Sequence, residues 1–213
     1  MTGDYSIDKY ENLLKGYYAG EFIKVYFVIF YFTVSCYFLL FYFRRKKSPD
    51  NLIFGLFCML LGSYFFLRTG IKYFLTGNYM ILQKAEYAIL FTLFPLFTQF
   101  IIMHFRRKIY WFQYIFYAVS ISGFVFILLT NEPLLWDFIN TNIIQPSWLI
   151  GTGTIAVILV REFRKQLQAK IMLFSFVILI IAIINDLFIS RYLITTPLIN
   201  KIGFFHLTVS LFS

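Results

Sequence analysis

The sequence predicts an all-α fold, a polytopic helical membrane bundle, from three observations. Hydrophobic residues make up 60% of the chain and charged residues only 14%. Apolar stretches recur from Phe22 to the last residue, and most approach the length of about 20 residues that crosses a bilayer. Short clusters of Lys and Arg follow alternate stretches. A helical bundle solvated by lipid has this composition and pattern, whereas a soluble domain does not.

Seven apolar segments are expected to be transmembrane helices, six of them full spans and the seventh truncated. Residues 22–43 and 52–68 are almost uninterrupted hydrophobic side chains, and each segment carries a single Lys or Arg near one end. Residues 85–105 carry one carboxylate, Glu86, in their first turn, and residues 109–129 carry no charge. These four segments are long enough to cross most of the hydrocarbon layer.

The last three segments are shorter or end in polar residues. Residues 147–160 are apolar after a run of small side chains, and residues 171–187 end in Asn185 and Asp186. Residues 198–213 would extend for about 24 Å as a helix, at about 1.5 Å per residue, and so would barely span the bilayer.

Residues 1–20 form a short extracytoplasmic leader before the bundle, which occupies residues 21–213. The leader repeats apolar side chains at helical spacing, as at Tyr10, Leu13 and Tyr17. Two interpretations are open: an amphipathic helix on the outer surface of the membrane, or a tail without a defined conformation. The leader lacks the basic start and apolar core of a cleaved signal peptide.

The positions of Lys and Arg predict the orientation of the bundle. Eleven of the 19 lie in three short segments, 44–51, 106–108 and 161–170. Because short loops rich in Lys and Arg remain in the cytoplasm, the amino terminus is expected outside and the end of the seventh helix inside. The residues on which this prediction chiefly depends are Arg44, Arg45, Lys46, Lys47, Arg106, Arg107, Lys108, Arg161, Arg164 and Lys165.

The charge distribution also predicts the main partner. A net charge of +9 would favour nucleic acid as the partner of a soluble protein. Here the basic residues flank spans, so the expected partner is the lipid bilayer and nucleic acid binding is excluded. Trp111, Trp136 and Trp148 fall near the expected span ends, where an aromatic belt would meet the lipid headgroups.

Small residues predict where the helices touch. Helices in lipid associate through close packing of small side chains rather than through hydrophobic burial. Gly55, Cys58 and Gly62 in the second segment, and Gly151 and Gly153 in the fifth, are therefore expected to form packing faces.

Polar residues near the outer ends of the helices are candidates for a functional site. Ionisable groups at membrane depth are costly, so each one suggests a function unless a partner explains it. Two interpretations are open: a pocket for a small-molecule ligand at the outer face, or a structural ion pair, such as Arg68 with Asp186 or Glu86, that locks the helices. The candidate residues are Arg68, Lys72, Glu86, Asn185 and Asp186.

No pattern in the sequence predicts an enzyme. A Gly-rich phosphate loop, a zinc-binding H-E-x-x-H motif and a nucleophile elbow are all absent from the sequence. The two histidines, His104 and His206, are expected at opposite depths, so they are poorly placed to hold one haem or metal. We therefore expect no catalytic residue, no metal and no cofactor.

Two stretches resemble a known family of sensors. One is Phe41-Tyr-Phe-Arg-Arg-Lys-Lys-Ser-Pro-Asp-Asn-Leu-Ile-Phe-Gly-Leu-Phe57, a tight basic turn followed by an apolar helix. The other is Ile184-Asn-Asp-Leu187, followed by Thr196-Pro-Leu198 and Gly203-Phe204. With seven spans, these stretches resemble the bacterial seven-transmembrane receptors with diverse intracellular signalling modules (7TMR-DISM), transmembrane region only, over about residues 22–213.

The resemblance implies a multi-pass sensor in a bacterial inner membrane. In that family an outer domain or the bundle perceives a signal, and the seventh helix passes it to a cytoplasmic effector such as a histidine kinase, a nucleotide or diguanylate cyclase, or a serine phosphatase. Compared with the family, this chain is expected to lack the outer domain and to stop inside the seventh helix. The effector would then act in cis or in trans, and a homodimer would suit signalling.

Two other functions are alternatives. A small transporter or channel would need broken helices or polar residues at the membrane midplane, and the centres of the first, second and fourth segments are largely apolar. A non-signalling remnant of a truncated receptor gene would form the same bundle without activity. The sequence alone leaves both alternatives open.

Overall fold

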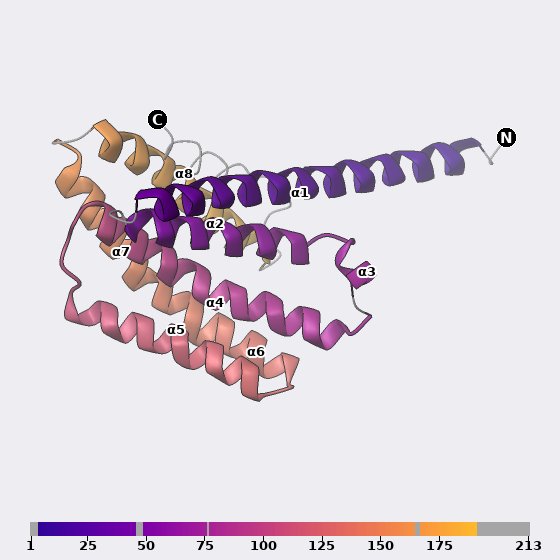
Figure 1. Ribbon diagram of the computed structural model, residues 1–213. Coiled ribbons are helices and arrows are strands. Elements are labelled where there is room, and N and C mark those ends of the chain that lie inside the picture. Colours follow the sequence, from indigo (N-terminus) through magenta and orange to yellow (C-terminus); the bar gives the residue numbers. More distant parts are fainter. Residues whose placement is uncertain (1–3, 46–48, 76, 165–166, 191–213) are drawn as a thin grey trace. The chain divides into compact units, whose positions relative to one another are not determined.

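A computed structural model describes residues 4–45, 49–75, 77–164 and 167–190, and these form helices and short connections with no strand. Figure 1 shows the helices in chain order. Their bounds are α1 Asp4–Arg45, α2 Pro49–Leu67, α3 Lys72–Leu75, α4 Tyr79–His104, α5 Trp111–Leu129, α6 Pro133–Ile139, the π-helix η1 Asn140–Ile144, α7 Gln145–Glu162 and α8 Leu167–Ser190.

Five helical stretches in the described ranges are long and apolar enough to cross a membrane. They are Tyr18–Arg44, Pro49–Leu67, Tyr79–His104, Trp111–Leu129 and Pro133–Glu162. The all-α membrane fold expected from the sequence is confirmed at this level. In α8, the described apolar stretch is the shorter Leu167–Ile178. The expected seventh span, 198–213, lies outside the described residues, so the full number of spans stays a prediction.

Two expected boundaries differ from the observed helices. The leader is helical from Asp4 and continues into the first span without a break, so α1 has 42 residues. The fifth helical stretch begins at Pro133 rather than at 147, because proline favours the first turn of a helix and the residues that follow remain helical. The segment 130–147, expected as a connection, is therefore mostly helix.

The described chain divides into two compact units. The first comprises Met1–His104 with Lys108–Gly151, and the second comprises Phe105–Arg107 with Thr152–Ser213. In the first unit α1 packs on α2, α2 on α4 and α4 on α5, so consecutive long helices are neighbours (Figure 1).

Small residues set the close approach of α1 and α2. A Cβ added to Gly55 would lie 2.9 Å from Leu39 Cδ2, and a Cβ added to Gly62 would lie 3.3 Å from Tyr31 Cβ. Cys58, on the same face of α2, is fully buried. Ser35 Oγ donates to the Gly55 carbonyl oxygen at 2.8 Å, so a hydrogen bond from a side chain of α1 to the backbone of α2 also joins the two helices. The packing face expected on the second segment is confirmed.

Aromatic side chains fill the space between α2 and α4. The Phe54 and Phe100 ring centroids are 4.8 Å apart, and those of Phe57 and Phe97 are 5.2 Å apart. Phe54, Phe57 and Phe97 are almost completely buried. Because lipid tails are as apolar as these rings, close packing rather than escape from solvent holds the helices together.

A second cluster lies where α4, α5, α6 and η1 meet. Phe91, Ile127, Trp136 and Ile144 are fully buried in it. The Trp136 indole N–H donates to Thr130 Oγ1 at 2.8 Å. The expectation of Trp136 in an interfacial belt was therefore wrong, because the earlier helix start turns this indole into the packed interior. Trp111, by contrast, is 74% exposed.

The two glycines expected to pack in the fifth segment differ. A Cβ added to Gly151 would lie 2.6 Å from Phe94 Cε1 and 3.0 Å from Thr98 Oγ1, so this glycine allows α7 to approach α4. Gly153 is exposed, and a Cβ added there would meet no atom of the described residues within 4 Å. The predicted packing role is correct for Gly151 and wrong for Gly153.

This difference predicts opposite effects of one substitution. Gly151→Ala is expected to lower the free energy of unfolding by about 1–3 kcal/mol, because Phe94 is held by Trp148, whose ring centroid lies 5.4 Å away, and cannot move freely. Gly153→Ala is expected to leave it unchanged or to raise it by up to about 1 kcal/mol, because alanine favours helix. Thermal unfolding in detergent measures both, and equal effects would contradict the packing.

The second unit contains the latter part of α7 and the described part of α8. Leu159, Met172 and Phe176 are almost fully buried in it. Ser175 Oγ donates to the Ile171 carbonyl oxygen at 3.0 Å, which satisfies a buried hydroxyl inside α8. The Lys170 ammonium lies 5.7 Å from the centroid of the Phe163 ring.

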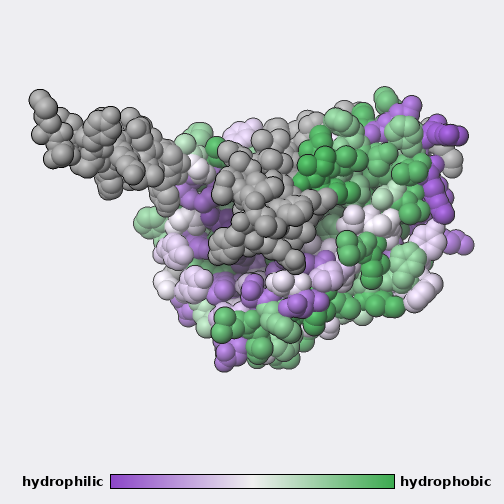
Figure 2. Space-filling view, turned by 180° about the vertical axis from the view of Figure 1, so that it is seen from behind, coloured by the Kyte–Doolittle hydropathy of each residue, from purple (hydrophilic) through white to green (hydrophobic). Residues whose placement is uncertain are grey.

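Large apolar side chains cover much of the exposed surface of the described residues (Figure 2). Phe22 on α1 is 75% exposed, and Leu149 on α7 is 74% exposed. The two cysteines, Cys36 and Cys58, are free. Since an apolar surface of this extent is stable only in lipid, the exposed side chains are the ones that contact the bilayer.

Candidate functional site

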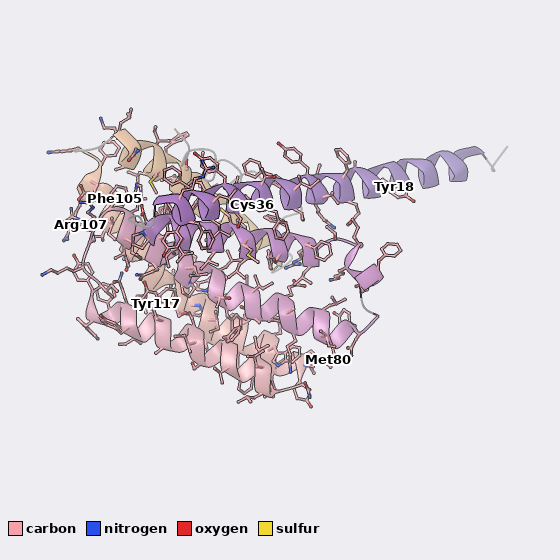
Figure 3. All side chains as sticks on the ribbon, viewed as in Figure 1. Tyr18, Cys36, Met80, Phe105, Arg107 and Tyr117 are labelled. Atoms are coloured by element: carbon pink, nitrogen blue, oxygen red, sulfur yellow. The ribbon has the colours of Figure 1, made fainter. Side chains whose placement is uncertain are left out.

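Two ion pairs lie at helix ends beside the Lys- and Arg-rich turns. In the first unit, His104 Nδ1 at the end of α4 lies 3.4 Å from Asp50 Oδ2 at the start of α2. In the second unit, Arg107, labelled in Figure 3, forms an ion pair with Glu162 at the end of α7. Lys108, the residue after Arg107, is exposed. The described basic residues of these turns therefore lie at helix ends.

The opposite ends of the helices in the first unit are joined by other polar contacts. Glu21 pairs with Lys24 on α1, and Glu21 Oε2 accepts the Gly70 N–H at 2.8 Å. Lys84 Nζ, near the start of α4, donates to the Leu128 carbonyl oxygen at 3.0 Å. The helices α1, α2 and α4 therefore carry polar groups at both ends of their apolar stretches.

These two ends predict a labelling result. In a variant carrying Cys36→Ser and Cys58→Ala, a cysteine at Gly77 is expected to react with a membrane-impermeant maleimide in intact cells. A cysteine at Lys108 is expected to react only after permeabilisation, because the distribution of Lys and Arg predicts that the basic turns face the cytoplasm. Both positions are exposed in the structure. Reaction at position 108 in intact cells would reverse the proposed orientation.

A polar cavity of about 500 Å³ opens at the end of the first unit that is opposite to Asp50 and His104. It lies between the end of α2, α3, the first part of α4, α6 and η1. Its lining contains two cations, two carboxylates, two amides and three phenols. The lining residues are Arg68, Lys72, Tyr73, Tyr79, Gln83, Glu86, Tyr87, Leu90, Asp137 and Asn140.

An ion pair between α2 and α4 forms one wall of the cavity. Arg68 Nε lies 2.8 Å from Glu86 Oε1, and Arg68 Nη2 donates to the Tyr64 hydroxyl at 2.9 Å. The Arg68 side chain is 56% exposed and that of Glu86 is 20% exposed. A pair this open to solvent contributes at most about 1 kcal/mol to stability. The pair therefore positions charge more than it holds the bundle together.

The opposite wall comes from α6 and η1. The Tyr87 hydroxyl on α4 donates to Asp137 Oδ1 at 3.2 Å. Asn140 is 7% exposed, and its Oδ1 is buried with no hydrogen-bond partner among the described residues. Gln83 Oε1 is likewise buried and without a partner in the described part of the chain. A native structure rarely leaves such groups unsatisfied without a reason.

The π-helix begins at Asn140. The Gln145 N–H donates to the Asn140 carbonyl oxygen five residues earlier, which widens one turn of an otherwise α-helical stretch. This extra residue changes the direction in which the side chains before and after it point. Such single-turn π-helices are frequent at functional sites.

Three of the five candidate site residues meet at this cavity: Arg68, Lys72 and Glu86. Asn185 and Asp186 lie within α8, but their side chains are outside what the structure describes. Lys46, Lys47, Lys165 and His206 also lie outside the described residues.

Sequence reasoning missed Asp137 and Asn140, which belong to the same cavity. They fall in the segment 130–147, which was expected to be a connection. The signal that could have found them is Pro133, a typical first residue of a helix, followed by Asp137 and Asn140 at a spacing of three, which puts both on one helix face.

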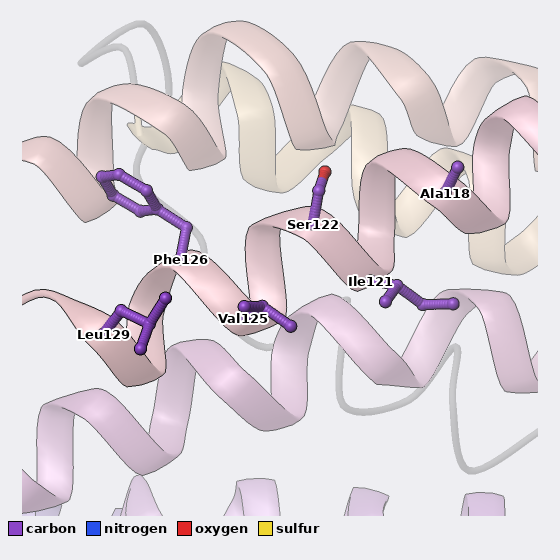
Figure 4. Close-up of a pocket in the computed structure, with 6 residues that line it drawn as sticks. All are labelled: Ala118, Ile121, Ser122, Val125, Phe126 and Leu129. Carbon is purple, nitrogen blue, oxygen red and sulfur yellow. The ribbon is translucent and has the colours of Figure 1, made fainter.

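A second hollow, of about 620 Å³, lies along α5 alone. Figure 4 shows its six lining residues on that one helix. They are Ala118, Ile121, Ser122, Val125, Phe126 and Leu129. It lacks charged groups. Within the described ranges, no three His, Cys, Asp or Glu side chains come together as a metal site would require.

The five apolar helices, the polar helix ends and the lipid-exposed surface define a multi-pass membrane protein. The chain matches the family model described as 7TM diverse intracellular signalling over residues 20–213, and it belongs to that family. The resemblance seen in the sequence is thereby confirmed, and the chain is a membrane sensory module. No curated protein and no solved structure matches it.

Proposed function

We propose that the chain senses a signal at the polar cavity and relays it through the bundle to a cytoplasmic effector in a bacterial inner membrane. The module itself performs no catalysis in this proposal, and the effector carries the chemistry. The observation that supports it best is the gathering of Arg68, Glu86, Asp137 and Asn140 around one cavity at the end of the bundle opposite to Asp50 and His104.

The covalent connection between cavity and cytoplasmic end suggests the relay. Asn140 and Asp137 belong to the helical stretch Pro133–Glu162, and Glu162 at its other end pairs with Arg107. A change in the cavity that shifts α6 and η1 would therefore act on the stretch whose far end carries this pair. In the proposed mechanism, occupancy of the cavity biases this helix and the two that follow it between two arrangements.

A fusion tests the proposal. A reporter kinase attached after Ser213 is expected to change its output about fivefold or more in the variants Arg68→Gln, Glu86→Gln and Asp137→Asn, because allosteric coupling of this kind is typically worth 1–3 kcal/mol. Ser122→Ala, on the exposed groove of α5, is the matched control and should leave the output unchanged.

Folded protein in the membrane is measured in parallel by size-exclusion chromatography of a fluorescent fusion. Normal folding with changed output supports the sensory cavity. Normal folding with unchanged output in all three variants contradicts it. Loss of folded protein would show that Arg68 and Glu86 are a structural lock, which also contradicts the proposal.

A further inference from the structure

The cavity lining has equal numbers of cations and carboxylates, but not every charged group has a partner. Arg68 pairs with Glu86, and Asp137 accepts a hydrogen bond from Tyr87. Lys72 has no carboxylate partner among the described residues, and its ammonium lies 5.3 Å from the centroid of the neighbouring Tyr73 ring. The cavity therefore presents one cation that has no anion within the described structure.

Two unsatisfied polar atoms of the lining, one on η1 and one on α4, are acceptors. Asn140 Oδ1 and Gln83 Oε1 are buried without a donor among the described residues. Each carboxylate, Glu86 and Asp137, also has a second oxygen that can accept from a ligand. A buried carbonyl oxygen needs an N–H or O–H donor, because folding has removed the water that would otherwise satisfy it.

We propose that the ligand of this cavity is a free α-amino acid. Its carboxylate would meet the Lys72 ammonium, and its primary ammonium group, with three N–H donors, would meet the Asn140 and Gln83 carbonyl oxygens near Asp137. A zwitterion also leaves the neutral charge balance of the lining unchanged. The inference rests on the proposed function, since the same cavity receives the signal there.

Three features distinguish this ligand from others of similar size. A quaternary ammonium zwitterion such as glycine betaine has no N–H to donate, so it would leave both amide oxygens unsatisfied. A neutral polyol would leave Lys72 without an anion. The cavity of about 500 Å³ falls in the range of about 300–1,000 Å³ typical of small-molecule sites, and Tyr79 and Leu90 offer an apolar surface for the amino acid side chain.

The full chain in lipid nanodiscs tests the inference by isothermal titration calorimetry. The probes are the twenty standard α-amino acids taken singly, glycine betaine and glycerol. At least one amino acid is expected to bind, and betaine and glycerol are expected not to bind at the same concentrations. Absence of binding by every amino acid would overturn the inference, as would binding of betaine or glycerol alone.

Amino acid substitutions test which residues of the cavity contact the bound amino acid. Lys72→Gln and Asn140→Leu are each expected to weaken binding of that amino acid about tenfold or more, since each removes a hydrogen bond to a charged group of the ligand. Lys108→Gln is the matched control, because Lys108 is exposed and does not line the cavity. Equal weakening in all three variants would overturn the assignment.

The binding result separates this inference from the proposed function. Amino acid binding without an effect of Arg68, Glu86 and Asp137 substitutions on the reporter leaves the ligand class standing and overturns the relay. Reporter effects without amino acid binding leave the relay standing and overturn the ligand class.

Discussion

Trp136→Ala is expected to lower the free energy of unfolding by about 3 kcal/mol or more and to abolish amino acid binding. The indole is fully buried among Phe91, Ile127 and Ile144, so its removal leaves a cavity that the surrounding helices can only partly fill. The Thr130 hydroxyl also loses the indole N–H that it accepts at 2.8 Å.

The effect on binding follows from the position of Trp136. It precedes Asp137 and lies one helical turn before Asn140, and its ring centroid lies 6.2 Å from that of Tyr87. Its packing therefore fixes the distance between α6 and α4, on which the cavity depends. Thermal unfolding in detergent and calorimetry measure the two effects.

Trp111→Ala is the matched control. Trp111 begins α5 and is largely exposed to lipid, so its removal opens no cavity in the interior. We expect a loss of less than about 1 kcal/mol. Equal losses for the two tryptophans would show that α6 does not pack as described.

Arg107→Gln is expected to destabilise the protein by about 1–3 kcal/mol, because it leaves the Glu162 carboxylate without its partner, although the Arg107 side chain itself is 35% exposed. The Glu162 side chain is only 6% exposed, and it would keep its charge in a position without the guanidinium. Because Glu162 ends α7, the same variant is expected to raise the mobility of this helix end, as hydrogen exchange would measure.

Two controls isolate the ion pair from the charge of the basic turn. Arg106→Gln removes the neighbouring positive charge, but Arg106 is exposed and forms no described ion pair, so only a small effect is expected. The double variant Arg107→Gln with Glu162→Gln should recover much of the stability, because it removes the buried charge as well. A double variant as unstable as Arg107→Gln alone would contradict the role of the pair.

Much of the fold could be predicted from the sequence because membrane insertion depends on local composition. Twenty apolar residues in succession become a helix in lipid whatever their neighbours are, since every backbone polar group must be satisfied within the segment. Gly55 and Gly62 were likewise recognisable as packing residues, because only small side chains allow two helices in lipid to approach closely.

The site could be predicted only in part. Arg68, Lys72 and Glu86 were candidates because a charge near the end of an apolar run is visible in the sequence. Asp137 and Asn140 were missed because polar residues between two apolar runs resemble an ordinary loop. Their place in the cavity depends on the helix that begins at Pro133 and on its packing against α4, which no local composition specifies.

The sequence by itself determined that this protein is a membrane protein and that it resembles a sensory family. It also determined that the turns between its helices are alternately rich and poor in Lys and Arg. These properties follow from the transfer of each segment into lipid, one segment at a time. Only the tertiary structure decided which polar side chains face each other across the cavity and that Trp136 is buried. Those outcomes depend on the rotation and approach of neighbouring helices, which are set by packing between residues far apart in the chain.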